Sequence, residues 1–345
     1  MKSYLITGGA GFFGTILKKH LLSNGAKCVS IDLEKDDFKH ENFTSYQGDV
    51  NDDKLMDEIF SSNKFDAIFH CAALLAHVKK DLKHLWRANV DGTQNICNYA
   101  IKHQIKKIVF ISSNCLWAKN FDSPVLESEV PNPIEIYGKS KLEGEKILLS
   151  NSDKVNSIIF RSPTIMDEGR LGLLGILFEF IDENRKLPMV GNGENCYQFI
   201  YAKDLVKACK LALDADYTDI FNIGSDDVKT FNEVYQYVID NSGSKSRLLH
   251  FPKLPMILAM KICFWLGISP LGPYQYKMIA SSFVFDTTKI KQKLGFVPTL
   301  KNEEMLLRAY EFYHQNKKEI LERKDVSAHN SVAKMGIIKL LKWMM

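Results

Sequence analysis

Residues 7–14 read TGGAGFFG and directly follow the short apolar run Ser3–Thr7 (SYLIT). Gly8, Gly11 and Gly14 stand three residues apart, and the apolar spacing of residues 15–23 predicts a helix after them. A backbone without Cβ atoms lets a pyrophosphate approach closely, and a helix N-terminus offers it free N–H groups and a positive dipole end. The stretch therefore predicts a strand, a glycine turn and a helix that together bind a dinucleotide.

The rest of the first half alternates between apolar runs and amphipathic segments. Further strands are expected at Lys27–Asp32, 67–71, 107–112 and 155–160, and helices at 53–60, 85–102 and Ile136–Ser150. This alternation predicts an α/β fold with a Rossmann-type, doubly wound parallel sheet.

The alternation loosens after Arg161, which predicts a smaller, mixed α/β substrate lobe over the carboxyl edge of the sheet. We expect helices at 172–184, 202–213, 231–241, 254–266, 287–294 and 303–316, and strands at 220–223 and 283–286. The expected organisation is a NAD-binding domain over 1–165 with a segment returning near 204–228, a substrate lobe over 166–203 and 229–320, and a basic amphipathic tail over 321–345.

Composition and charge exclude several classes of protein. The 345 residues are 46% hydrophobic and 25% charged, which excludes disordered and collagen-like chains. Residues 316–345 hold seven Lys/Arg and three acids, which accounts for the whole net charge of +4, so the neutral body predicts no nucleic-acid partner. The seven cysteines contain no CxxC pair, which predicts buried free thiols in a reducing compartment and no metal site.

Two acids are candidates for contacts with the cofactor. Asp32 ends the second expected strand, 18 residues after Gly14, where a carboxylate can accept hydrogen bonds from ribose hydroxyls and repels a 2′-phosphate. The sequence therefore favours NAD over NADP. Asp49, in QGDV, either faces the adenine or caps the helix expected at 53–60.

A catalytic group is predicted where the sheet meets one helix. Tyr137 and Lys141, in YGKSK, share one helix face, and Ser113 follows a central strand. A phenol has a pKa near ~10, so an ammonium beside it and a positive nicotinamide would favour the phenolate that acts as a base. A second YxxxK pair, Tyr313 and Lys317, is interpreted as a solvated helix face.

Together these segments resemble the extended short-chain dehydrogenase/reductase superfamily, in its NAD-dependent epimerase/dehydratase branch. The motifs that carry the resemblance span about residues 1–315: TGGAGFFG, Asp32, Gly48-Asp49-Val50, HCAA at 70–73, ANVDGT with Asn89, ISSNCLW and YGKSK.

The resemblance implies hydride transfer to and from NAD at a sugar hydroxyl. It implies that Tyr137 is the acid/base, that Ser113 binds the substrate hydroxyl, and that Lys141 binds the nicotinamide ribose and lowers the phenol pKa. The cofactor-binding residues it implies are Gly8, Gly11, Phe12, Phe13, Gly14, Asp32, Asp49, Val50, Ala72, Ala73, Leu74, Asn89, Tyr137, Lys141 and Pro163. The substrate-binding residues it implies are Ser113, Asn114, Thr164 and Tyr197.

The sequence also departs from the family's pattern. Asn114 and Cys115 stand where the dehydratases have Asp-Glu, so 4,6-dehydration is not expected. Tyr197 stands where an Arg usually clamps the nucleotide diphosphate, and a phenol cannot make that bidentate, charged contact. Arg170 either replaces that phosphate contact or is an exposed loop charge.

Two apolar segments remain outside this assignment. Residues 254–268 (LPMILAMKICFWLGI) are apolar almost all round, which suits a buried lobe helix, a dimer contact, or a surface for a membrane or a lipid-linked substrate. Residues 334–345 (KMGIIKLLKWMM) place Lys334, Lys339 and Lys342 opposite an apolar arc with Trp343. Such a helix suits either reversible contact with an anionic membrane through 332–345 or docking on a protein surface.

Three hypotheses follow for the function. The first is a NAD-dependent epimerase or oxidoreductase acting on a nucleotide sugar in glycan biosynthesis. The second is the same chemistry on a polyprenyl-diphosphate-linked sugar or a sterol- or terpenoid-like alcohol, and the third is a non-catalytic NAD-binding protein. The expected location is the cytoplasm, either free or peripheral on the inner membrane face. The resemblance implies a homodimer through a helix pair that includes 136–150.

Overall fold

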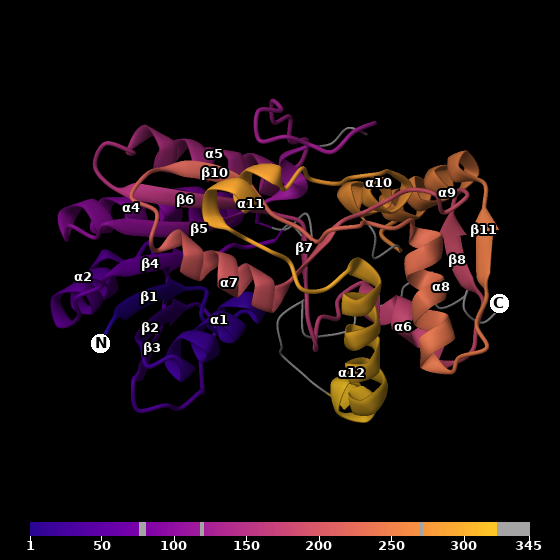
Figure 1. The fold of residues 1–345 in the computed structure, drawn as a ribbon, viewed down its shortest axis with the longest axis horizontal. Helices are drawn as coiled ribbons and strands as arrows, with labels where there is room; N and C mark the ends of the chain where they lie inside the picture. The colour runs from indigo at the N-terminus through magenta and orange to yellow at the C-terminus, as the bar shows by residue number, and fades with distance from the viewer. Residues whose placement is uncertain (76–80, 118–120, 269–271, 323–345) are drawn as a thin grey trace.

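A parallel sheet of seven strands forms the larger half of the protein (Figure 1). The computed structural model describes all residues except 76–80, 118–120, 269–271 and 323–345. The strand order is β10-β6-β5-β4-β1-β2-β3, and every pairing is parallel. The strands are β1 (Ser3–Thr7), β2 (Lys27–Asp32), β3 (Phe43–Gln47), β4 (Ala67–His70), β5 (Lys107–Ser113), β6 (Asn156–Ser162) and β10 (Asp219–Asn222). The predicted α/β fold class is confirmed.

The strand order reverses between β1 and β4, and this reversal positions the site. β1 pairs with β2 on one side and with β4 on the other, so the chain winds outward in both directions from this point. Ligands of open α/β sheets bind at the carboxyl ends of the strands where the order reverses. Here those ends are Thr7 and His70.

Helices cover both faces of the sheet, because alternate strand residues point to opposite faces. Leu5 packs in a cluster with α2 and α4, whereas its neighbours Tyr4 and Ile6 pack in a cluster with α1 and α7. The covering helices are α1 (Phe12–Ser23), α2 (Asp53–Ser62), α3 (Leu82–Trp86), α4 (Gly92–Lys102), α5 (Ile136–Ser150), α7 (Ala202–Ala212) and α11 (Thr288–Leu294).

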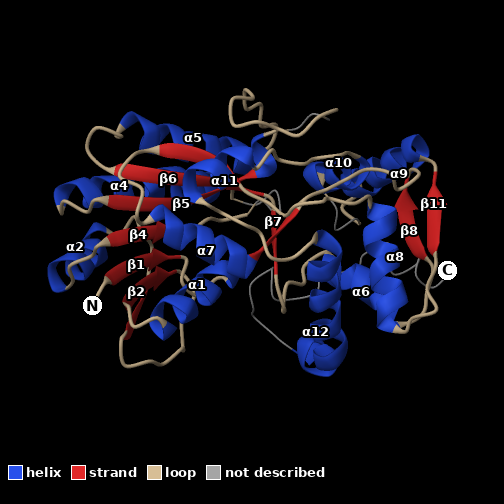
Figure 2. Ribbon diagram, viewed as in Figure 1, coloured by secondary structure: helices blue, strands red, loops and turns tan. Residues whose placement is uncertain are grey.

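A second lobe, on the right of Figure 2, has its own aromatic core. It holds two short parallel pairs, β7 (Thr164–Met166) with β9 (Phe199–Tyr201) and β8 (Leu187–Val190) with β11 (Leu248–Phe251). Its helices are α6 (Leu174–Asp182), α8 (Phe231–Ser242), α9 (Lys253–Trp265), α10 (Pro273–Ala280) and α12 (Asn302–Glu322). None of the helices in the described part of the chain is long and apolar enough to cross a membrane.

Several local expectations are corrected by the structure. The helix expected over 85–102 contains a π-helical turn, Arg87–Asp91, between α3 and α4. The strand expected at 283–286 is absent, because Phe283 and Phe285 make only isolated bridges, to Tyr197 and Val125. The four short strands β7, β8, β9 and β11 were not predicted, since three or four residues carry too little periodicity.

Three interpretations of exposure are also wrong. Tyr313 is fully buried in the lobe core, so the pair with Lys317 does not form a solvated face. The apolar helix α9 has no buried residue, so it is not a buried lobe helix. All seven cysteines are free, but only Cys28, Cys97 and Cys209 are buried.

Candidate active site

The glycine turn lies at the carboxyl end of β1. Gly8 has a φ of +73°, and a Cβ there would lie 2.8 Å from the backbone of Ala72, which follows β4. A Cβ on Gly14 would lie 2.1 Å from the carbonyl oxygen of Gly8, so glycine alone allows α1 to start this close to the turn. Steric clashes with neighbouring backbone therefore explain why glycine stands at positions 8 and 14 of the motif.

The first turn of α1 suits a pyrophosphate. The helix begins at Phe12, inside the glycine motif, and its N-cap Gly11 makes no side-chain hydrogen bond. No acid stands in this first turn, so the N–H groups of Phe12, Phe13 and Gly14 face no carboxylate of their own helix. A backbone turn that a Cβ would block, followed by an uncapped helix start, fits the phosphates of a dinucleotide.

Asp32 lies at the end of β2, beside the glycine turn. One carboxylate oxygen accepts a hydrogen bond from the N–H of Ala10 at 2.9 Å, and the other accepts from Glu34 at 3.0 Å. Each oxygen keeps a lone pair for a further donor. The carboxylate thus fixes the turn and still suits ribose hydroxyls.

Asp49 does not cap α2, because Asp52 does so by accepting from the N–H of Leu55. The Asp49 carboxylate accepts from Asn51 at 2.9 Å and lies 3.6 Å from the guanidinium of Arg87. The helix-capping alternative is therefore wrong. Val50, which follows Asp49, is buried.

Asn89, on the π-helical turn, links the segment after β4 to α5. Its carboxamide oxygen accepts from the N–H of Leu74 at 2.7 Å, and its nitrogen donates to the Leu74 carbonyl at 3.0 Å. The same nitrogen donates to the Ser140 hydroxyl at 2.9 Å, which in turn donates to the carbonyl of Tyr137. One side chain thus holds the Ala72–Ala73–Leu74 segment against the helix that carries Tyr137.

His70 continues this network below the site. Its ring bonds to the Thr7 hydroxyl at 2.7 Å and to the Thr93 hydroxyl at 2.9 Å, and Thr93 donates to the Asn89 carbonyl. Burial lowers the pKa of His70 to about 3, with a smaller contribution from the charge of Lys141, so the ring is neutral. Thr93 and Ser140 had not been expected in the site, and each is visible in the sequence only as an ordinary helix residue.

Ser113 and Tyr137 meet at the carboxyl end of β5, and Lys141 lies one turn further along α5, against the same strand. Ser113 forms a side-chain hydrogen bond with Tyr137, and its hydroxyl also accepts from the N–H of Cys115 at 3.1 Å. The ammonium of Lys141 is buried, donates to the Ile111 carbonyl at 2.8 Å, and lies 4.6 Å from the centre of the Phe110 ring. Two neighbouring elements, β5 and α5, supply all three side chains.

Burial dominates the electrostatics of this group. It raises the pKa of Tyr137 above its ordinary value, Cys115 raises it further, and the Ser113 hydrogen bond and Arg170 act in the opposite direction. Burial also lowers the pKa of Lys141 to about 8. The pKa of Tyr137 is therefore raised in the protein alone, and its lowering by Lys141 together with a positive nicotinamide stays a prediction for the protein with bound NAD.

The expected substrate residues lie at the junction of the two lobes. Asn114, in a short 3₁₀ turn after β5, donates a hydrogen bond of 2.6 Å to the hydroxyl of Tyr197. Tyr197 is buried, and its ring stacks on Phe231. Thr164 begins β7 and is half-buried, and Pro163 before it is buried.

Arg170 is a functional candidate that the sequence left undecided. It lies in the turn between β7 and α6, where its N–H donates to the Asp167 carbonyl at 3.1 Å. Its guanidinium is half-buried, stacks 5.6 Å from the centre of the Phe12 ring, and interacts electrostatically with Tyr137 and Tyr197. Among the residues that the structure describes, no carboxylate forms an ion pair with it. The exposed-loop interpretation is therefore wrong.

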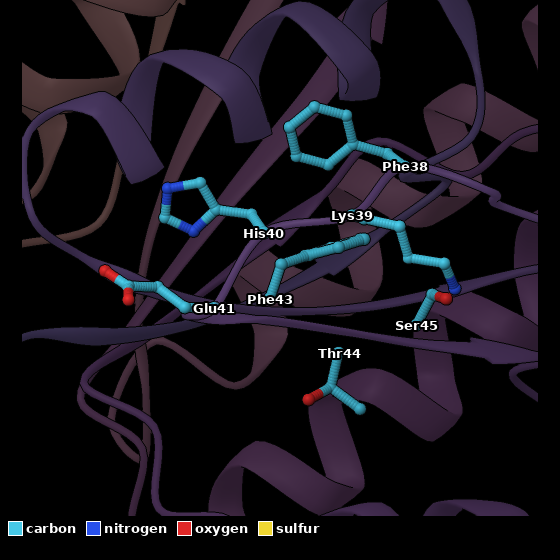
Figure 3. Close-up of a pocket in the computed structure, with 7 residues that line it drawn as sticks. All are labelled: Phe38, Lys39, His40, Glu41, Phe43, Thr44 and Ser45. Atoms are coloured by element: carbon cyan, nitrogen blue, oxygen red, sulfur yellow. The ribbon is translucent and has the colours of Figure 1, made fainter.

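A pocket at the outer edge of the sheet is separate from this group. It is lined by residues of the β2–β3 connection and β3, with Phe38 and Phe43 among them (Figure 3). The ammonium of Lys18 lies 5.3 Å and 5.1 Å from the centres of these rings, pairs with Asp36, and donates to the Gly9 carbonyl. Lys18 thereby ties this edge to the glycine turn.

Comparison with known proteins agrees with this geometry. The model of the NAD dependent epimerase/dehydratase family matches residues 4–224. The chain belongs to this family. An uncharacterized protein, y4nG, of Sinorhizobium fredii is 34% identical over 99% of this chain and 86% of its own length.

Other family members are more distant in sequence and similar in fold. The 4-epimerase of N-acetyl-α-D-glucosaminyl-diphospho-ditrans,octacis-undecaprenol from Escherichia coli O157:H7 is 26% identical over 92% of this chain and 97% of its own. The UDP-glucose 4-epimerase of Thermotoga maritima, solved with UDP-glucose, superposes with a TM-score of 0.75, at 24% identity over 91% and 99% of the two chains. The Bordetella bronchiseptica enzyme WbmG, solved with NAD and UDP, also gives 0.75, at 20% identity over 90% and 94%.

Membership of this family makes the protein a NAD-dependent enzyme of the epimerase/dehydratase type. The cofactor is NAD, whose phosphates fit the glycine turn and the start of α1 described above. The roles of the individual residues remain predictions. Arg170 joins the candidate substrate-binding residues.

Proposed function

We propose that the protein is a NAD-dependent epimerase that acts on a hydroxyl of a diphosphate-linked sugar, with a nucleotide sugar of glycan biosynthesis as the favoured substrate. The observation that carries this proposal is the hydrogen bond between Ser113 and Tyr137, with the buried Lys141 one turn further along α5, at the sheet edge that also holds the glycine turn. A non-catalytic NAD-binding protein would not need these three groups together.

In this proposal each residue has one task. The bound NAD supplies the acceptor for the hydride. Tyr137, as phenolate, takes the proton from the substrate hydroxyl, and Ser113 holds the oxygen between the two side chains. Lys141 holds a positive charge below the phenol, and Asn89 fixes α5 at Tyr137 through Ser140. If the resulting ketone rotates in the site, the hydride and proton return to its other face, and the configuration at that carbon is inverted.

Two positions argue against dehydration at this site. Asn114 is a neutral amide that donates its N–H to Tyr197, and Cys115 has a thiol in place of the second acid of the dehydratases. Water elimination needs an acid and a base at the reacting carbons. The proposed reaction therefore stops at the ketone and its reduction.

A lipid-linked sugar is the second candidate substrate, and Tyr197 favours it. This residue cannot offer a charge to a nucleotide diphosphate, and its hydroxyl oxygen accepts a hydrogen bond from Asn114. The Escherichia coli relative named above acts, by its name, on a sugar joined to undecaprenol through a diphosphate. Contact of residues 332–345 with the membrane falls outside the described part of the chain and stays a prediction, as does the homodimer.

The function is tested by the fate of the cofactor and of one hydrogen. We expect purified protein to release stoichiometric NAD on denaturation and to epimerise UDP-glucose or the undecaprenyl-diphosphate sugar without added NAD. Deuterium at the reacting carbon should stay in the product, because the same hydride returns to it. Appearance of the label in free NADH would instead show a net dehydrogenase and contradict the epimerase proposal.

Arg170 is proposed to bind an anionic group of the substrate, and its replacement tests this role. We expect Arg170→Met to raise the KM of a diphosphate sugar about 10- to 100-fold, because a charge-assisted hydrogen bond contributes about 1.5–3 kcal/mol. Initial rates over a range of substrate concentrations measure the effect. Arg185→Met is the matched control, at an arginine whose side chain is 44% exposed.

The division of the effect between KM and kcat distinguishes two roles for Arg170. A higher KM with little change in kcat supports contact with substrate, and Arg170→Lys should recover part of it. A lower kcat with unchanged KM would show that Arg170 acts only on the charge of Tyr137 and would contradict substrate binding.

A further inference from the structure

One helix of the smaller lobe exposes an apolar stripe to solvent. α9 (Lys253–Trp265) lies at the upper right of Figure 1, where it contacts α10 and β8. Leu254 and Trp265 are each 81% exposed, and Leu258 is 60% exposed. Single exposed apolar residues are ordinary on a protein surface, but a contiguous run of this kind marks an interaction site.

The helical geometry places these side chains on one face. At about 100° per residue, Leu254, Trp265, Leu258, Ile262 and Leu266 fall within an arc of about 120°. Every one of them is exposed. The opposite side of the helix holds the half-buried Met256, Met260, Cys263 and Phe264. Apart from Lys253 and Lys261, α9 is therefore apolar all round, with one side against the lobe and the other in solvent.

The Lys, Arg, Asp and Glu residues of the chain segment that carries the stripe are all of one sign. Residues 241–285 contain five Lys/Arg and no Asp or Glu. Four of these cations are exposed: Lys245, Arg247, Lys253 and Lys261. Lys261 lies at the edge of the stripe, about 20° from Leu254. The segment therefore combines an exposed apolar face with exposed cations along the same stretch of chain.

We infer that α9 docks on an anionic lipid bilayer. Its Leu and Ile side chains would enter the boundary between headgroups and acyl chains, Trp265 would lie at the interface, and the surrounding cations would face lipid phosphates. A second copy of the chain fits less well, because two such faces would bring Lys261 of each copy together. Residues 332–345 fit poorly for the same reason, since they hold three lysines and no acid.

This inference stands on α9 alone and does not depend on the proposed catalytic reaction. Together with an active site for diphosphate sugars, a docked α9 would give the enzyme access to a substrate anchored in the same bilayer. Its test accordingly measures binding to lipid and not turnover, so that either proposal can fail without the other.

The test is cosedimentation of the full chain with vesicles of phosphatidylcholine containing phosphatidylglycerol. We expect binding that is weak on pure phosphatidylcholine, falls as salt is added, and falls about tenfold or more in Leu258→Glu. Val297→Glu is the matched control, since it adds the same charge at a 70% exposed apolar residue outside the stripe. Circular dichroism and NAD content verify that both variants are folded.

The outcomes of this experiment distinguish a lipid bilayer from a second copy of the chain as the partner of the stripe. Loss of vesicle binding in Leu258→Glu but not in Val297→Glu supports docking of α9. Equal binding by both variants would overturn the inference and assign the membrane contact to another segment. The inference would be overturned in favour of a second copy if the wild-type protein did not bind vesicles and instead formed a dimer that Leu258→Glu dissociates in analytical ultracentrifugation.

Discussion

Tyr137→Phe is expected to lower kcat by about 10³-fold or more while the protein keeps its NAD. The phenol oxygen is the only part of the side chain that is removed, and general acid–base groups contribute about 10²–10⁴-fold to turnover. The ring remains to fill its place on α5, next to the Ser113 hydroxyl. Single-turnover and steady-state rates, measured beside the NAD content of the purified variant, report the effect.

Tyr313→Phe provides a matched control for this experiment. Tyr313 also precedes a lysine by four residues, but it lies in the core of the other lobe, and its buried hydroxyl has no hydrogen-bond partner among the described residues. We expect this variant to keep full activity. If Tyr137→Phe retained more than about a tenth of the activity, Tyr137 could not be the acid/base, and the catalytic assignment would be wrong.

Arg161→Met is expected to reduce the free energy of unfolding by about 3–5 kcal/mol, because it leaves a buried carboxylate without its partner. Arg161, on β6, donates to Glu145 of α5 through Nε at 3.0 Å and through a terminal nitrogen at 2.7 Å. Both side chains are almost fully buried, and Ser112 donates to the same carboxylate at 2.6 Å. Chemical denaturation measures the loss.

The double variant Arg161→Met, Glu145→Met tests the physical reason. Replacing both partners of a buried ion pair by apolar residues is often close to neutral, so we expect the double variant to be more stable than Arg161→Met alone. Equal loss in the single and double variants would show instead that the cost comes from the other contacts of Arg161, with the Glu127 carbonyl and the Trp117 ring.

The parts of the site that the sequence predicted depend on short stretches of chain. The glycine turn, Asp32 and the Tyr137–Lys141 pair each need only a strand or helix of known register, and their spacing is therefore visible in the sequence. The capping of α2 by Asp52 was missed because Asp49 is also near the helix start, and both residue types suit a cap.

Arg170 and α9 could not be placed from the sequence, for opposite reasons. Arg170 is defined by Phe12, Tyr137 and Tyr197, which come from three distant segments, so no local pattern predicts its surroundings. α9 has a clear local pattern, but a helix that is apolar all round suits burial as well as exposure. Only the three-dimensional structure shows that one side of α9 packs on no other described element and faces solvent.

The order of the chain through the two lobes has a consequence during synthesis. β10 joins the edge of the large sheet only after β7, β8 and β9 have emerged, and the lobe core is completed by α12 near the end of the described chain. The core of the large lobe receives its last residues from α11 and Phe296, before α12 completes the core of the smaller lobe. The nascent protein therefore exposes apolar surface of the smaller lobe until α12 appears, and a truncation before α12 is expected to require chaperones or to aggregate.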